Sequence, residues 1–186
     1  MVRFKHRYLV VSLLFPAALA LAPAHDPDTP PYEPPHLSEG AVISLLRDSL
    51  AVNFGDIGAG EVGGTFSIKY LSPSTSTLIL RVAREHHRTL WAALTLLRKV
   101  GGQECVARVV HVSGTIRKTQ HAAIAHDRAE ILLAAARART RARCRRALVR
   151  KSGGKAGASV AEDDVLDRET EARLRESEKR IVAIEA

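Results

Sequence analysis

In residues 3–14, RFKHRYLVVSLL, charged and apolar side chains alternate before the run becomes apolar throughout. In an extended chain, Arg3, Lys5 and Arg7 occupy one face and the intervening side chains occupy the other. From Tyr8 onward both faces are apolar. The pattern predicts a buried strand whose first half is exposed on one face. The three basic residues on that face form a track that could follow phosphates, and the alternative is a solvated strand edge that its charge keeps soluble.

The same residues also fit a secretory signal peptide. A basic start, an apolar run and small residues at positions 22–24 have the order that such a peptide requires. The rest of the chain favours the strand, because removing residues 1–24 would leave an α-β-β-α-β set without its central strand. The chain has only two cysteines, Cys105 and Cys144, and no N-glycosylation acceptor, which also weighs against secretion.

Outward from this strand, the chain enters a proline-rich segment and then a helix. Residues 15–36 hold seven of the eight prolines, so they are interpreted as a surface loop insertion. Apolar residues then recur at helical spacing from Val42 to Phe54, with Ser38 as the N-cap. A glycine-rich loop around Gly58 is expected to end this helix.

The next elements are a hairpin, a second helix and a fourth strand. Residues 65–71 and 77–84 alternate as two strands joined by a turn. An apolar stripe from Leu90 predicts a helix that ends at Gly101, and residues 105–112 supply the last strand. The order β-α-β-β-α-β predicts a ferredoxin-like α/β (α+β) sandwich, whose antiparallel sheet packs one face on two helices and leaves the other available.

Three regions follow from this order. Residues 1–136 form the ferredoxin-like domain, and residues 137–151, with eight basic residues and no acidic one, form an arginine-rich helical extension or arm. Residues 152–186 are expected to be a flexible linker and an acidic tail that is disordered or marginally helical.

Charge points to an anionic partner. The formal net charge is +8, and the segment 160–186 carries nine acidic and five basic residues, so residues 1–159 carry about +12. A body of this charge attracts nucleic acid or an acidic membrane surface. Beyond residue 22, no apolar run reaches the 18 residues typical of a membrane span.

No protein active site is predicted. Residues 58–63, GAGEVG, match the glycines of a dinucleotide fingerprint, but they follow a helix and precede a strand, which is the wrong context. No cysteine or histidine spacing resembles a metal site, and no nucleophile stands beside a base. The ring-rich motif of RNA-recognition sheets is also missing, so nucleic-acid binding would be mainly electrostatic.

A second basic element follows the fourth strand. Ser113-Gly114-Thr115 can close that strand and cap the next helix, and Arg117 and Lys118 stand in its first turn. Cations at a helix N-terminus are unfavourable by about 0.3–1 kcal/mol unless an anion occupies that end. The stretch predicts a phosphate contact, with a plain cap as the alternative.

Three stretches carry a family resemblance: MVRFKHRYL at 1–9, KYLSPSTSTLILRVAREHHRTLWAAL at 69–94 and HVSGTIRKTQ at 111–120. On these the chain resembles the Pop-five protein subunit family of ribonuclease P and ribonuclease MRP. The resemblance covers residues 1 to about 136, apart from the proline-rich insertion and the glycine-rich loop.

The resemblance implies a subunit of an RNA-catalysed endoribonuclease. In that family the RNA carries the metal-dependent chemistry, with Mg²⁺ expected on the RNA and no cofactor on the protein. The particle removes the 5′ leader of precursor tRNA, and the MRP form processes precursor rRNA. Implied partners are the catalytic RNA, precursor tRNA indirectly and other protein subunits, including the Rpp-thirty (Rpp-one) type. No membrane partner is implied, and the implied location is the nucleus and nucleolus.

The residues expected to contact RNA are basic side chains of the resembling stretches: Arg3, Lys5, Arg7, Lys69, Arg81, Arg84, Arg117 and Lys118. Two other interpretations remain open at this point. One is a secreted basic protein whose mature chain starts near His25, and the other is a ferredoxin-like domain that binds a small ligand or forms oligomers.

Overall fold

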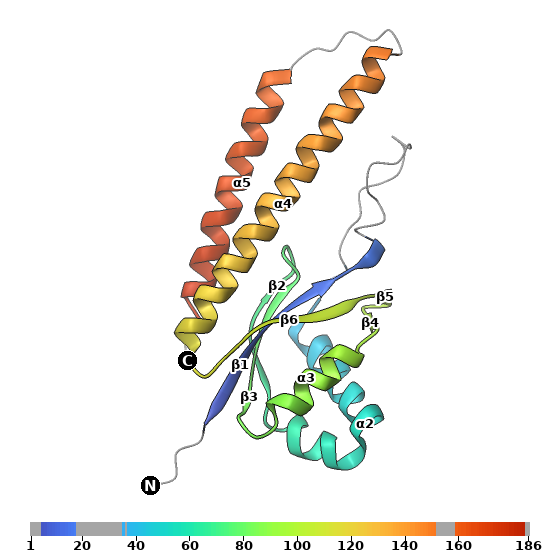
Figure 1. Ribbon diagram of the computed structural model, residues 1–186, viewed down its shortest axis with the longest axis vertical. Helices are drawn as coiled ribbons and strands as arrows, with labels where there is room; N and C mark the ends of the chain where they lie inside the picture. Colours follow the sequence, from blue (N-terminus) through green and yellow to red (C-terminus); the bar gives the residue numbers. More distant parts are fainter. Residues whose placement is uncertain (1–4, 18–34, 36, 152–158, 185–186) are drawn as a thin grey trace.

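The computed structural model describes residues 5–17, 35, 37–151 and 159–184. The described residues contain a four-stranded sheet. Figure 1 shows helices on both faces of this sheet, and the long C-terminal helices extend beyond it. The elements are β1 (His6–Leu14), α2 (Glu39–Gly63), β2 (Ser67–Ser72), β3 (Thr77–Ala83), α3 (His87–Leu96), β4 (Lys99–Val100), β5 (Gln103–Glu104), β6 (Val106–Ser113), α4 (Ile116–Lys151) and α5 (Ser159–Val182).

Strand β1 lies at the centre of the sheet. The strand order is β2-β3-β1-β6, and β1 runs antiparallel to both of its neighbours. Tyr8, for example, lies opposite Arg81 on β3 and Ser113 on β6. This confirms the ferredoxin-like order and the central strand predicted from residues 3–14.

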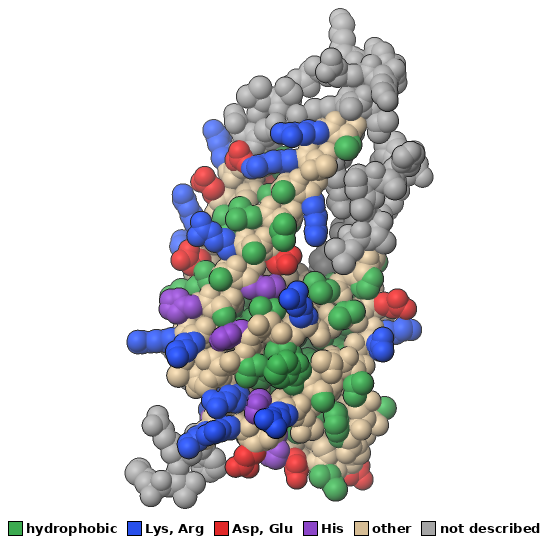
Figure 2. Space-filling view, viewed as in Figure 1, with side chains coloured by type: hydrophobic (Ala, Val, Ile, Leu, Met, Phe, Trp, Pro, Cys, Tyr) green, Lys and Arg blue, Asp and Glu red, His purple; other side chains and the backbone are tan. Residues whose placement is uncertain are grey.

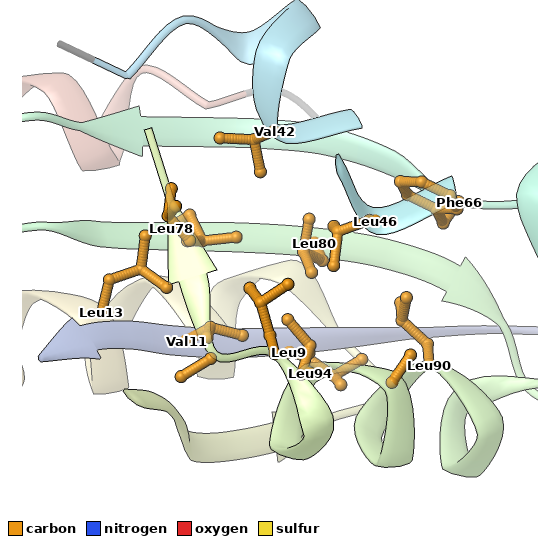
Figure 3. Close-up of a cluster of buried hydrophobic side chains, with 14 of the residues drawn as sticks. Leu9, Val11, Leu13, Val42, Leu46, Phe66, Leu78, Leu80, Leu90 and Leu94 are labelled. Atoms are coloured by element: carbon orange, nitrogen blue, oxygen red, sulfur yellow. The ribbon is translucent and has the colours of Figure 1, made fainter. Parts of the chain in front are cut away.

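The main core lies between the sheet and helices α2 and α3. Alternate residues of each strand point to this face, because successive side chains of a strand point to opposite sides. Figure 3 shows the packing of these side chains, which include Leu9, Val11, Leu46, Leu78, Leu80, Leu90 and Leu94. Since Leu9 and Leu80 are fully buried, the apolar half of β1 is part of the core.

Helix α2 begins where the sequence predicts and ends later. Ser38 is its N-cap, with the Ala41 amide donating to Ser38 Oγ at 3.2 Å. The glycine-rich loop expected around Gly58 is wrong, because the helix continues to Gly63 beyond a kink at Gly55. The second half stays helical because it buries Val62, 1% exposed, in the core.

Helix α3 is shorter than the apolar stripe suggests. It ends at Leu96, and Val100 lies in the short strand β4 instead of the helix. Gly101 and Gly102, both with positive φ, make the turn to β5. Val100 is buried in the same core, so its side chain satisfies the apolar pattern from a strand.

The second face of the sheet is covered, which corrects the expectation that it is available. Tyr8, Val10, Tyr70 and Ile79 point to this face, where they pack against Ala123 of α4 and Ile181 of α5. Figure 1 shows α4 and α5 as the long helices that lie side by side against the sheet. Ile181 is fully buried. The acidic tail therefore forms a helix packed along α4, where the sequence predicts disorder or a marginal helix.

Of the three predicted regions, the structure describes most of the domain, the arginine-rich segment and the acidic tail. The arginine-rich segment 137–151 continues helix α4. The linker at 152–158 and most of the proline-rich insertion lie outside the described residues, so those boundaries stay predictions. Within the described part of the chain, no helix is long and apolar enough to cross a membrane.

Candidate nucleic-acid interface

Four chain segments meet at one end of the sheet: the start of β1, the end of β3, the end of β6 and the start of α4. His6 lies opposite Ala83, and the Arg84 amide donates to the carbonyl of Lys5 at 2.9 Å. Tyr8 lies opposite Ser113, the last residue of β6. Antiparallel pairing therefore brings basic residues that are far apart in the sequence to the same end of the sheet.

We call this surface the basic end; it consists of Lys5, Arg7, Arg81, Arg84, Arg117 and Lys118. Figure 2 shows Lys and Arg side chains gathered in the lower left of the view, around the starts of β1 and α4. Six of the eight predicted contacts are thus brought to one end of the sheet.

Arg7 lies against the turn that joins β6 to α4. A side-chain carbon added at Gly114 would collide with Arg7 Nη1, so the guanidinium occupies the space that the glycine leaves open. This approach links the first basic stretch to the second. Sequence reasoning missed the role of Gly114, because a close approach between residues 7 and 114 leaves no local signal.

The start of α4 has the features of an anion site. The Thr115 amide donates to Ser113 Oγ at 3.3 Å, which orders the turn before the helix. Arg117 and Lys118 are exposed, and the first turn contains no acidic residue. The free amide groups, the helix dipole and these two cations act in the same direction on a phosphate.

Arg81 is held beside a histidine. Its Nη2 lies 3.3 Å from Nε2 and 3.4 Å from Nδ1 of His6, and both side chains are partly buried. Burial lowers the pKa of His6, and the positive charge of Arg81 lowers it further. The ring is therefore neutral at neutral pH and accepts a hydrogen bond from the guanidinium.

Two predicted contacts are not part of the basic end. Lys69 lies at an irregularity of the edge strand β2, between Ile68 and Tyr70, and β3 separates it from β1. Arg3 lies outside the described residues.

The remaining chemistry of the described residues is sparse. They contain no group of three or more histidine, cysteine, aspartate or glutamate side chains that could hold a metal ion. Cys105 is buried, and burial raises the pKa of its thiol to about 11, whereas Cys144 is exposed. The Cys105 thiol therefore stays protonated and unreactive at neutral pH.

Fold and surface together define a class of protein: a ferredoxin-like domain with cations concentrated at one end of its sheet and a helical C-terminal addition. The chain belongs to the Rpp14/Pop5 family, whose model matches residues 7–124. This confirms the family resemblance carried by the three sequence stretches.

Relatives from two organisms agree with this membership. The chain is 44% identical over 131 residues to the ribonuclease P/MRP protein subunit POP5 of Schizosaccharomyces pombe, covering 70% of this chain and 91% of the relative. It is 33% identical over 137 residues to the human ribonuclease P/MRP protein subunit POP5, covering 72% of this chain and 76% of the relative. A chain in a cryo-EM structure of yeast ribonuclease MRP matches with a TM-score of 0.43 and 14% identity, over 63% of this chain and 79% of that one.

Proposed function

We propose that this chain is a protein subunit of a ribonuclease P/MRP ribonucleoprotein and that it binds and supports the RNA of that particle. The observation that carries the proposal is the 44% identical relative, a ribonuclease P/MRP subunit of which the chain covers 91%. The basic end supports it, since six cations at one end of the sheet suit a phosphate backbone.

The proposal assigns the chemistry to the RNA. The catalytic Mg²⁺ is bound by the RNA, and the protein supplies cations that hold the folded RNA in place. The reactions are the 5′ maturation of precursor tRNA and, in the MRP particle, processing of precursor rRNA. The location that goes with this work is the nucleus, including the nucleolus.

Other protein subunits, including one of the Rpp-thirty (Rpp-one) type, contact the outer surface of α2 and α3 in this proposal. The second face of the sheet is already covered by α4 and α5. Large apolar side chains are exposed on the two helices that cover the other face of the sheet, namely Val52 and Ile57 on α2 and Trp91 and Leu96 on α3. Exposed apolar groups of this kind mark surfaces that proteins cover.

The test is charge reversal at the start of α4. The double variant Arg117→Glu/Lys118→Glu keeps the fold, because both side chains are exposed, but repels phosphates. We expect at least about tenfold weaker binding to the catalytic RNA, and a salt dependence that is shallower by roughly 1.4 to 1.8 for the two lost charges.

Arg98→Glu/Lys99→Glu is the matched control, since these two exposed cations lie at the β4 side of the molecule, away from the basic end. The control should bind nearly as the unaltered protein does. Unchanged affinity and salt dependence in the α4 variant would refute the assignment of these contacts. Purification of the native protein without any structured RNA would contradict the function itself.

A further inference from the structure

A cleft of about 680 Å³ lies at the end of the sheet opposite the basic end. Its walls include the last residues of β1, from Ser12 to Leu14, and Phe15, which follows the strand, whereas the basic end starts from the first residues of β1. The turn between β2 and β3 forms one side, and helices α4 and α5 form the other. The cleft is therefore separate from the interface described above.

Arginine side chains from two helices line this cleft. Arg137 comes from α4, and Arg173 and Arg180 come from α5. Arg180 pairs with Glu176 on its own helix. Arg137 and Arg173 are exposed and make no ion pair with any other described residue. Two guanidinium groups thus remain available for an anion.

Hydroxyl groups at the end of β2 and in the β2–β3 turn line the opposite wall. Ser72 Oγ and Ser74 Oγ lie 3.1 Å apart. Thr75 Oγ1 is buried and has no hydrogen-bond partner among the described residues. A buried hydroxyl without a hydrogen-bond partner is uncommon in proteins. A ligand oxygen that accepted a hydrogen bond from the Thr75 hydroxyl would satisfy it.

The packing of α5 builds the cleft. Ile181 is buried against the sheet, and Gln120 Nε2 donates to the carbonyls of Ile181 at 3.2 Å and Ile184 at 3.0 Å. Ser177 Oγ donates to Asp127 Oδ2 at 2.8 Å. These contacts hold α5 along α4, so arginines separated by more than 30 positions in the sequence line one space.

We propose that this cleft binds the phosphodiester backbone of a single-stranded RNA segment. Planar guanidinium groups and hydroxyl donors are the groups that recognise phosphate oxygens, and the volume lies within the range of ligand pockets. The inference rests on the proposed function and adds a second contact to it. All three arginines lie beyond residue 124, where the family match ends, whereas the hydroxyl-bearing wall of the cleft lies within the matched residues.

The test compares two double variants of the full chain. Arg137→Gln/Arg173→Gln removes the two unpaired cations of the cleft. Arg143→Gln/Arg168→Gln removes one exposed arginine from each of the same two helices outside the cleft. The probe is a labelled single-stranded oligouridylate of twelve nucleotides, and the readout is its dissociation constant as a function of salt.

The cleft variant should bind the oligonucleotide about fivefold more weakly, with a salt dependence shallower by roughly 1.4 for two charges on a single strand. The dissociation constant of the control variant should change less than about twofold, because removing exposed charges outside a contact has a small effect on binding. Equal losses in the two variants would overturn the inference, since they would indicate general attraction only.

Two further outcomes are distinguishable. If the catalytic RNA binds in a manner that depends on Arg117 and Lys118 while the cleft variant matches its control, the proposed function stands and the cleft inference fails. If inorganic phosphate alone raises the melting temperature of the control but not of the cleft variant, and oligonucleotide affinities are equal, the cleft takes a small anion and RNA binding there is refuted.

Discussion

Two arginines of the basic end are positioned by neighbours that carry no charge at neutral pH. Gly114 leaves room for the Arg7 guanidinium, and the neutral ring of His6 accepts a hydrogen bond from Arg81. The sequence predicts Arg7 and Arg81 as contacts from their own stretches. It gives no hint of these neighbours, because contacts between distant residues depend on strand pairing and loop closure.

His6 should make the stability of the protein depend on pH. Its pKa is lowered in the folded state, so at pH values below the unfolded pKa of about 6.5 the unfolded chain binds the proton more readily. Stability is therefore highest above that value and falls as the pH drops through it. We expect His6→Gln to lose less stability than the unaltered protein between about pH 7.5 and 5.5, measured by urea unfolding. An identical pH dependence in both proteins would contradict this origin.

At the scale of elements, helix α2 shows where a local pattern misleads. The glycines near position 58 suggest a loop, yet only Gly55 departs from helical geometry, with φ 64° and ψ −165°. The helix resumes because the chain after the kink returns Val62 to the core. Similarly, Val100 fits the apolar spacing of α3 but is buried from β4, because a core position can be filled from either element.

Two glycine substitutions in α2 should change the stability of the protein in opposite directions. The conformation of Gly55 is open essentially only to glycine, so Gly55→Ala should destabilise the protein by about 1–3 kcal/mol. Gly60 lies inside the helix with no atom within 4 Å of an added side-chain carbon. Gly60→Ala should therefore stabilise by roughly 0.5–1 kcal/mol. Thermal or urea unfolding measures both, and a Gly55 variant as stable as the Gly60 variant would show that the kink is not strained for other residues.

At the scale of the whole molecule, helix α5 completes the second sheet face. It lies along α4 and brings Ile181 onto Tyr8, Val10, Tyr70 and Ile79. An acidic helix beside a basic one is also electrostatically favourable, as in the ion pair of Arg139 with Asp167. The described residues therefore form a core on each face of the sheet.

Detaching α5 from the sheet should leave the main core, between the sheet and helices α2 and α3, intact. Ile181→Asp places a carboxylate at a fully buried position, whereas Val182→Asp changes a neighbour that is 62% exposed. Hydrogen exchange should show α5 amides exchanging at least about tenfold faster in the Ile181 variant, with β1 and α2 unchanged. The Val182 variant should match the unaltered protein. Unchanged protection of α5 in the Ile181 variant would show that this side chain does not anchor the helix.

Local sequence patterns predict the β-α-β-β-α-β order of the domain, the Ser38 cap, the hairpin and the family, because alternation, helical spacing and turn residues are local properties. The sequence also determined which residues are basic. The tertiary structure alone decided that six of these lie at one end of the sheet, that α5 covers the second face and that three arginines line a cleft. The physical reason is that these features depend on pairing and packing between segments far apart in the chain, and no local pattern specifies such contacts.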